Sequence, residues 1–170
     1  AVLPKEQDFY IPEFSKDVHY EGELVLKMCR NGKYIPEEFA HSYFEEITVG
    51  IDFTARDLQA ELKKKGHPWE IAKGFNGSAP IGDFINKNSL KDPNNIHFSL
   101  NKNGETVQQG ASKDMIFNFA HLISYVSQFF LIGKGDLIFT GTPVGVGPIA
   151  IGDYFEGFIE DQRLMRCEIK

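Results

Sequence analysis

The residues with the clearest capacity for chemistry lie in one ten-residue segment, 18–27, with the sequence VHYEGELVLK. In an extended strand successive side chains point to opposite faces, so His19, Glu21 and Glu23 would share one face. Carboxylates two residues apart on a strand stand about 6–7 Å apart at their Cα atoms. Side chains that lean inward can then share one hard cation, at metal–oxygen distances of about 2.0–2.6 Å.

The alternative interpretation of this segment is a solvated strand face. The apolar run Leu24–Leu26 follows the glutamates and indicates burial, and buried carboxylates need a partner. This context favours the metal site. His19 is interpreted as a neighbouring or packing residue, because none of the five histidines has the HxxxH or His–Cys spacing of a zinc site.

Asp52 supplies a third carboxylate. It lies near the end of the apolar segment Ile47–Phe53, which is typical of a strand buried on both sides, just before a predicted helix that starts with Thr54 as its N-cap. The partial positive charge of a helix N-terminus favours an anion there. Glu21, Glu23 and Asp52 together would suit Mg²⁺, Mn²⁺ or Ca²⁺, which prefer oxygen ligands.

Two further segments could contact an anionic substrate. Lys73 stands between Ala72 and Gly74, where small neighbours would let a ligand approach; the alternative is a surface lysine. Residues 140–147, TGTPVGVG, follow an apolar strand and could expose backbone N–H groups to an oxyanion, or form only a tight turn. This loop lacks the Gly-Lys-Ser/Thr ending of a P-loop and the GxGxxG order of dinucleotide folds.

Covalent nucleophilic catalysis has no support in the sequence. There is no Gly-x-Ser-x-Gly motif, and neither Cys29 nor Cys167 stands beside a plausible base in the sequence. These are the only two cysteines and no CxxC occurs, which favours a reducing compartment and leaves one disulfide open as an alternative. We therefore expect a cytoplasmic protein.

The composition indicates a globular domain. A chain of 170 residues is long enough for one domain with a sizeable core. Its net charge of −6 argues against nucleic acid as a partner. The longest apolar region, Met115–Leu131, is interrupted by polar residues, so we expect no membrane partner.

Hydrophobic patterns predict many short strands and two main helices. The strands are expected at 18–29, 47–53, 80–85, 96–100, 105–109, 137–139, 154–159 and 163–169, and the helices from Thr54 to Gly66 and over 113–131, with a short helix at 36–43. Strands and helices do not alternate regularly, which excludes a doubly wound sheet. The fold class is a β-rich α+β domain.

These segments together resemble the fumarylacetoacetate hydrolase family. The matching stretches are HYEGELVLKM, VGIDFTARDLQ, KKKGHPWEIAKGF, GASKDMIF and GDLIFTGTPVGVGPIAIGD, in the order that the family has them. The pair IDFTARDLQ and GTPVGVG is the most specific part. The resemblance covers nearly the whole chain from residue 17 onward and is stronger to the small single-domain members than to the long two-domain enzyme.

The resemblance implies a mixed β-roll, usually a homodimer, with Mg²⁺ or Mn²⁺ in an open site. Glu21 and Glu23 match the family's ExE strand and Asp52 matches its D-x-[ST]-A-R-D segment, which are its metal ligands. Lys73 matches a polar residue near the metal and substrate, and we predict a catalytic role for it.

Two further matches concern the substrate. Gln59 matches a polar residue near the metal and substrate, and Thr142 matches the Gly-Thr-Pro position that contacts the substrate carboxylate.

One departure from the family concerns residues 1–17. Members carry an Asn-Tyr-x-x-His segment and a nearby glutamate upstream of the ExE strand, a pair thought to activate water under a mobile lid. Nothing in residues 1–17 matches it, and Ala1-Val2-Leu3 resembles the end of the family's Lys-Pro-x-x-Ala segment. We therefore expect residues 1–170 to form a single catalytic domain that lacks this lid and catalytic segment.

The expected function is that of a divalent-metal-dependent enzyme acting on a small 2-oxo mono- or dicarboxylic acid through a metal-stabilised enolate. C–C bond hydrolysis or decarboxylation, on substrates of the acylpyruvate or oxaloacetate type, is the first choice. The alternative within enzymes is an isomerase of the 2-hydroxyhepta-2,4-diene-1,7-dioate type. The alternative of another class is a catalytically silent domain that binds a metal and a 2-oxo acid.

Overall fold

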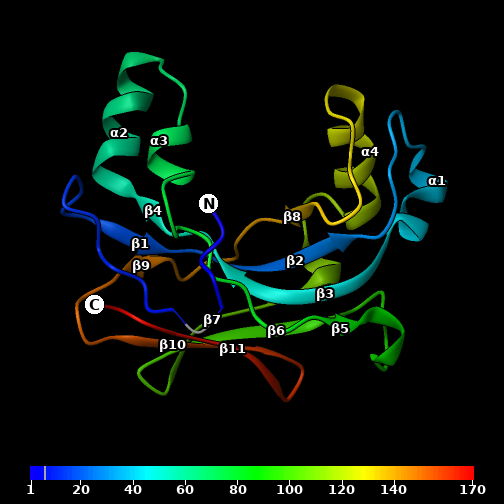
Figure 1. Ribbon diagram of the computed structural model, residues 1–170. Coiled ribbons are helices and arrows are strands. Elements are labelled where there is room, and N and C mark those ends of the chain that lie inside the picture. Colours follow the sequence, from blue (N-terminus) through cyan, green and yellow to red (C-terminus); the bar gives the residue numbers. More distant parts are fainter. Residues whose placement is uncertain (6) are drawn as a thin grey trace.

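The computed structural model describes residues 1–5 and 7–170, which form layered sheets with helices on one side (Figure 1). The strands are β1 (Val18–Tyr20), β2 (Gly22–Met28), β3 (Phe44–Ile51), β4 (Thr54–Ala55), β5 (Ile85–Asn86), β6 (His97–Lys102), β7 (Glu105–Ala111), β8 (Leu137–Phe139), β9 (Gly147–Pro148), β10 (Tyr154–Ile159) and β11 (Gln162–Glu168). The α-helices are α1 (Glu37–Ala40), α2 (Arg56–Lys65), α3 (Glu70–Lys73) and α4 (Phe119–Phe129). Short 3-10 turns cover His41–Tyr43, Lys87–Ser89 and Ser112–Asp114.

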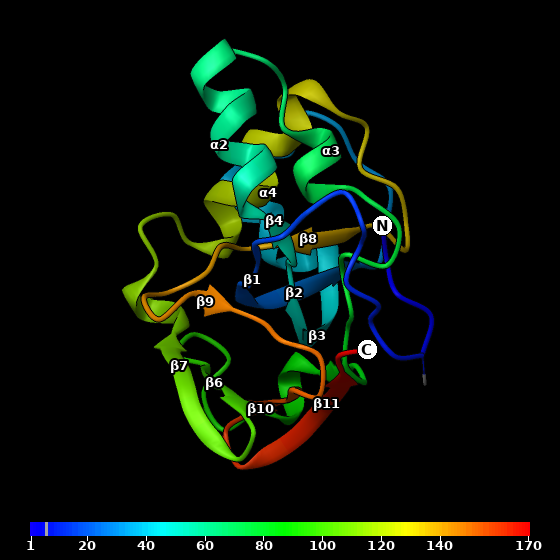
Figure 2. The ribbon, with the colours of Figure 1, turned by 90° about the vertical axis from the view of Figure 1, so that its left-hand side faces the viewer.

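The strands form three sheets, with the orders β5-β3-β2-β8, β11-β10-β6-β7 and β4-β1-β9. Figures 1 and 2 show β2 and β3 between the helices on one side and the sheet of β10, β11, β6 and β7 on the other. Helices α2 and α3 stand together at one end of this arrangement, and α1 and α4 at the other (Figure 1). The expected β-rich α+β roll with two main helices, α2 and α4, is confirmed.

Two hydrophobic cores hold these layers together. The first core joins β2 and β3 to β6 and α4, and includes Leu24, Val49 and Ile123. The second lies beneath β1 and includes Tyr20 and Phe155. Burial of apolar surface is the main force that stabilises both.

The chain changes sheets at Glu21, and this break positions the candidate ligands. The predicted continuous strand 18–29 is therefore wrong in detail: β1 ends at Tyr20 and β2 begins at Gly22. β1 contributes Val18 and Tyr20 to the second core, whereas β2 contributes Leu24 to the first. Glu21 occupies the point of transfer between them.

The antiparallel pairing of β2 with β3 brings Asp52 next to Glu21. Gly22 lies opposite Ile51 and Glu23 lies opposite Gly50. Immediately beyond this pairing, the backbone N–H of Asp52 donates to the carbonyl oxygen of Glu21 at 2.8 Å. Residues 31 positions apart in the sequence therefore become direct neighbours.

Several of the predicted element boundaries differ from the structure, three of them for reasons that the contacts show. The long helix begins at Phe119 rather than at 113, because the Asn118 side chain accepts a hydrogen bond from His121 N at 2.8 Å and caps it there. Thr54 is in β4 and caps no helix; α2 begins at Arg56. The predicted strand 80–85 is replaced by one bridge between Gly50 and Ile81 and by the two residues of β5.

Among residues 1–5 and 7–170, no helix combines the length and the apolar character that crossing a membrane requires. Cys29 and Cys167 are both free, so the alternative of one disulfide is not realised in this structure.

Asp57 fastens the start of α2 to the segment that precedes β1. Its carboxylate accepts hydrogen bonds from Ser15 Oγ at 2.7 Å, Lys16 N at 2.9 Å and Leu58 N at 2.8 Å. Slight burial acts to raise the pKa of Asp57, but these hydrogen bonds hold it below its ordinary value of 3.8. Asp57 therefore helps to set where Arg56, the first residue of α2, enters the site.

We predict that Asp57→Asn lowers the free energy of unfolding by about 1 kcal/mol at neutral pH, because an exposed carboxylate at a helix start contributes on that order. The folded-state pKa is depressed, so the stabilisation is present above the ordinary value and is lost as the pH falls through the folded value. Urea denaturation at several pH values measures the difference between variant and wild type. Asp161→Asn, in the exposed turn before β11, is the control; equal effects of both changes would contradict the prediction.

Candidate active site

The three predicted carboxylates converge in the structure. Glu21, Glu23 and Asp52 each offer an oxygen atom, and these atoms all lie within 4.8 Å of one another. The Glu23 side chain is the most buried of the three, with Glu23 only 5% exposed. The set contains oxygen donors only, which suits a hard divalent cation and is poor for zinc.

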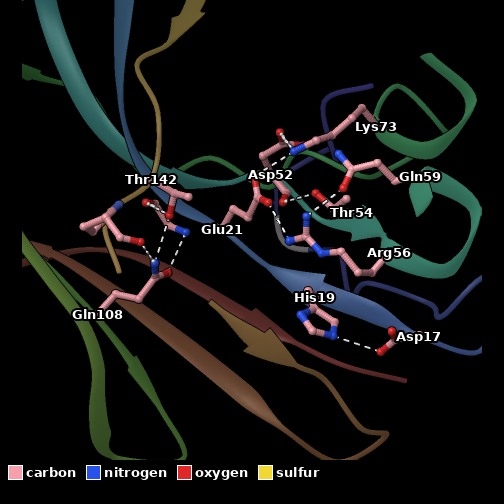
Figure 3. A network of polar contacts seen from close by, with 12 residues as sticks. Asp17, His19, Glu21, Asp52, Thr54, Arg56, Gln59, Lys73, Gln108 and Thr142 are labelled. Atoms are coloured by element: carbon pink, nitrogen blue, oxygen red, sulfur yellow. Dashed lines mark hydrogen bonds and ion pairs between the residues drawn. The ribbon is translucent and has the colours of Figure 1, made fainter. Parts of the chain in front are cut away.

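Lys73 joins two of these carboxylates. It is the last residue of α3, and its ammonium group donates to Glu21 Oε2 at 2.7 Å and to Asp52 Oδ2 at 2.6 Å (Figure 3). The Lys73 side chain is about one quarter exposed, so it is not the free surface lysine of the alternative interpretation. Burial acts to lower the pKa of Lys73, but the two carboxylates raise it overall, which keeps the amine protonated.

Arg56 supplies the second positive charge. Its guanidinium donates to Glu21 Oε1 at 2.6 Å and to Gln59 Oε1 at 2.8 Å, one helical turn further along α2 (Figure 3). Gln59 thus reaches the carboxylate cluster through Arg56. Sequence reasoning did not single out Arg56, although it belongs to the segment IDFTARDLQ, whose i, i+3 spacing places Arg56 and Gln59 on one helix face.

The surroundings lower the pKa of one of the three carboxyl groups and raise the pKa of the other two. Burial would raise the pKa of Glu21, yet hydrogen bonds from Lys73 and Arg56 lower it overall. Burial raises the pKa of Asp52 despite its hydrogen bond from Lys73. Glu23 has neither cation as a hydrogen-bond partner, and burial, reinforced by repulsion from Asp52 and Glu21, raises its pKa to about 7.

A bound divalent cation fits this cluster. Three carboxylates face two positive side chains, Lys73 and Arg56, so one negative charge is left without a partner. That charge falls on Glu23, whose one hydrogen bond among the described residues comes from the backbone N–H of Gly141 at 2.7 Å. A buried carboxylate in this position lacks the counter-charge that burial requires, and a cation would supply it.

The Gly-Thr-Pro loop lies directly against β2, beside Glu23. The Thr142 hydroxyl donates to the carbonyl oxygen of Gly22 at 2.9 Å, so its single proton is already used. Within residues 1–5 and 7–170, no acceptor is found for the backbone N–H of Thr142. If Thr142 contacts a substrate carboxylate as predicted, the N–H is therefore the donor that is available.

A cavity of about 460 Å³ adjoins this loop, within the usual range for small-molecule sites. It is lined by Thr142, Pro143 and Val144 of the loop and by apolar side chains that include Met115, Phe117 and Leu122. The three carboxylates are not among the residues that line it, and the cavity meets the site at the loop.

The structure thus brings together Glu21, Glu23, Asp52 and Lys73 directly, and Gln59 through Arg56. Thr142 lies at the other end of the site, attached to Gly22 and to Gln108 (Figure 3). His19 does not join the cluster: its Nε2 pairs with Asp17 at 2.9 Å. For Gln108, no signal was found in the sequence.

Comparison with known proteins places this chain in a class of enzymes. A family model described as "Fumarylacetoacetate (FAA) hydrolase C-terminal" matches residues 1–170. The chain belongs to the fumarylacetoacetate hydrolase family, and its similar relatives are enzymes. The resemblance seen in the sequence is thereby confirmed.

Three relatives show the range of the family around this chain. Oxaloacetate tautomerase FAHD1, mitochondrial, from Mus musculus is 40% identical over 170 residues, which are 100% of this chain and 77% of that protein. The structure of fumarylpyruvate hydrolase from Pseudomonas aeruginosa in complex with Mn²⁺ and pyruvate is 36% identical, with a TM-score of 0.90 over 99% of this chain and 71% of the other. That of 5-carboxymethyl-2-hydroxymuconate delta-isomerase from Mycobacterium smegmatis is 29% identical, with a TM-score of 0.84 over 95% and 62%.

We predict that Lys73→Met destabilises the metal-free protein by about 1–2 kcal/mol, less than for a fully buried pair because Lys73 is partly exposed. The raised pKa of Lys73 means that its contribution is complete below the ordinary lysine value of 10.5, hence at neutral pH. Urea denaturation in the presence of a chelator is the measurement.

The control for this change is Lys27→Met, because Lys27 also pairs with a carboxylate, Glu46, at 2.7 Å, but with 38% and 42% of the two side chains exposed. Its loss should be below about 0.5 kcal/mol. Equal stability of Lys73→Met and wild type would show that Lys73 does not hold the carboxylates together.

Proposed function

We propose that this protein is a divalent-metal-dependent enzyme acting on a small 2-oxo acid. The observation that carries the proposal is the carboxylate cluster, in which Glu23 is buried beside Glu21 and Asp52 and forms no ion pair with any described residue. We assign Glu21, Glu23 and Asp52 as the metal ligands. Their all-oxygen chemistry supports Mg²⁺ or Mn²⁺, and the Mn²⁺ and pyruvate in the Pseudomonas aeruginosa relative support the same combination of cation and 2-oxo acid.

When bound, such a cation supplies Lewis-acid polarisation of a carbonyl group. The chain's own residues surround the position where negative charge would develop. Lys73 presents a protonated amine beside Glu21 and Asp52, and can hold an enolate oxygen by a charge-assisted hydrogen bond. We propose this as its catalytic role.

The remaining residues would bind and orient the substrate. The backbone N–H of Thr142 would donate to its carboxylate, and the side-chain amide of Gln59, fixed by Arg56, would donate from the opposite side. The cavity beyond Thr142 provides space for the rest of the molecule, and its apolar lining favours an acyl chain there.

The reaction is proposed to be C–C bond hydrolysis or decarboxylation, on acylpyruvate or oxaloacetate. The fumarylpyruvate hydrolase relative supports the first of these. The isomerase relative from Mycobacterium smegmatis supports the alternative, isomerisation of a 2-hydroxyhepta-2,4-diene-1,7-dioate type of substrate, which uses the same enolate chemistry. A silent domain that binds metal and 2-oxo acid is the remaining alternative.

The assembly and the compartment stay predictions. We propose a homodimer and a cytoplasmic location, whereas the murine relative is named a mitochondrial protein. Light scattering after gel filtration tests the first, and microscopy of the full-length product in its host cell tests the second.

We predict that Glu23→Gln weakens Mn²⁺ binding at least about 100-fold, because it removes the one carboxylate that has no other cation. Isothermal titration calorimetry of the metal-free protein with Mn²⁺ is the measurement, followed by a turnover assay. Glu46→Gln is the matched control, since within residues 1–5 and 7–170 Glu46 forms an ion pair only with Lys27, on the surface. Should Glu23→Gln keep both metal binding and turnover, the assignment of the site would be wrong.

We predict that the full-length gene product turns over acylpyruvates or oxaloacetate only in the presence of Mg²⁺ or Mn²⁺, and that a chelator abolishes this activity reversibly. Ultraviolet absorbance with product analysis separates loss of a carbon fragment or of CO₂ from a shift of a double bond. A double-bond shift in a 2-hydroxyhepta-2,4-diene-1,7-dioate type of substrate, without loss of a carbon fragment or CO₂, would establish the isomerase alternative. Metal and oxalate binding without any turnover would establish the silent domain.

A further inference from the structure

Gln108 is a buried glutamine that the catalytic proposal does not use. It lies on β7, in a different sheet from the carboxylates, and is only 2% exposed. A buried side-chain amide must satisfy its donors and its acceptor within the protein. The partners of Gln108 are therefore informative about what it does.

All of those partners belong to the candidate site (Figure 3). Gln108 Oε1 accepts from the backbone N–H of Gly22 at 2.8 Å, between the two glutamates of the metal-binding strand. Its Nε2 donates to Thr142 Oγ1 at 2.9 Å and to the carbonyl oxygen of Pro143 at 3.0 Å. One planar amide thus connects the strand that carries Glu21 and Glu23 to the Gly-Thr-Pro loop.

The hydrogen bond from Gln108 to Thr142 also determines in which direction the Thr142 hydroxyl donates its proton. Thr142 Oγ1 accepts from Gln108 and donates to the carbonyl oxygen of Gly22. The hydroxyl thus uses its donor role and one acceptor role inside the protein, and the Thr142 side chain holds the loop against β2 and β7. The backbone N–H of Thr142 is the group that this arrangement leaves for an anion.

Two glycines allow the close approach that these bonds require. A Cβ atom on Gly22 would lie 3.1 Å from Gln108 Oε1 and 3.1 Å from Leu100 Cδ2. Gly145 has a φ of +106°, and a Cβ atom there would lie 2.3 Å from the carbonyl oxygen of Val107. The loop therefore rests directly on β7, on the strand segment that presents Gln108.

We propose that Gln108 is a positioning residue that fixes the spacing between the metal-binding strand and the backbone N–H of Thr142, and thereby the affinity for a 2-oxo carboxylate. It acts through Gly22 and Thr142 and does not touch the substrate. The effect on the affinity for a substrate carboxylate rests on the proposed function, whereas the fixed spacing between β2 and the loop does not.

Glutamine suits this position because it offers one acceptor and two donors on a rigid plane. Glutamate has the same shape and keeps the acceptor for Gly22, but it offers at most one donor, when protonated, and none when ionised. Methionine has a similar length and keeps neither. The two substitutions therefore separate the bond to Gly22 from the bonds to Thr142 and Pro143.

The first test is amide hydrogen exchange by NMR in the metal-free protein, at the backbone N–H groups of Gly22 and Gly141. Gln108→Met should speed exchange at both at least about 10-fold, because one hydrogen bond contributes on that order. Gln108→Glu should speed exchange at Gly141 while Gly22 keeps its acceptor. Unchanged exchange at both amides in Gln108→Met would overturn the proposal.

The second test is oxalate binding to the Mn²⁺-loaded protein by calorimetry. Gln108→Met should weaken oxalate at least about 10-fold while Mn²⁺ affinity changes less than about 3-fold, and in turnover KM should rise more than kcat falls. Oxalate affinity equal to wild type would overturn the proposal. Failure of the wild type itself to bind Mn²⁺ or oxalate would overturn the proposed function, while the exchange experiment still decides the spacing.

Two control variants exclude a general loss of stability. Ser127→Ala removes another buried acceptor, that of Ile35 N at 2.9 Å, at a position on α4 that does not line the cavity. It should lower the melting temperature as Gln108→Met does but leave oxalate affinity unchanged. Gln109→Met, at the exposed neighbouring position, should change neither; a loss of oxalate affinity in Ser127→Ala equal to that in Gln108→Met would contradict the positioning role.

Discussion

The backbone hydrogen bond from Asp52 to Glu21 completes the antiparallel pairing of β2 with β3 and holds two carboxylates side by side. Glu23, two residues into β2, brings a third. Like charges at this distance repel, so the arrangement persists only because both strands are buried and two cations, Lys73 and Arg56, are supplied from the neighbouring helices. The positive charges of Lys73 and Arg56 compensate part of this repulsion, and the proposed cation would compensate the rest.

The helices that supply the cations are themselves fixed by local interactions. Asp57 ties the start of α2 to residues 15 and 16, so that Arg56 emerges toward Glu21. Lys73 is held at the end of α3, where the Ser78 hydroxyl donates to its carbonyl oxygen at 2.6 Å. The contacts that stabilise the two helices therefore also position the two cations. The mutually repelling carboxylates stay together because the surrounding fold holds these cations beside them.

The sequence allowed the fold class, most strands and the carboxylate set to be predicted, because these depend on local pattern and on a family resemblance. The break at Glu21 was not predictable, since it depends on which of two cores buries each side of the strand. The start of α4 depends on one cap, Asn118. Gln108 was missed because its importance comes from partners 34 and 86 positions away, and no local pattern reports such contacts.

Above about pH 7, where Glu23 is ionised, the carboxylate cluster carries one negative charge more than Lys73 and Arg56 supply, and this excess affects the order of binding. An anionic organic acid that approaches the cation-free site meets repulsion, and it meets attraction only after a divalent cation has entered. Under the proposed function the association is therefore ordered, with the cation first and the acid second. The free cation concentration in the compartment would then set the fraction of molecules able to bind any organic acid, and cation-free molecules would escape competition from abundant carboxylates.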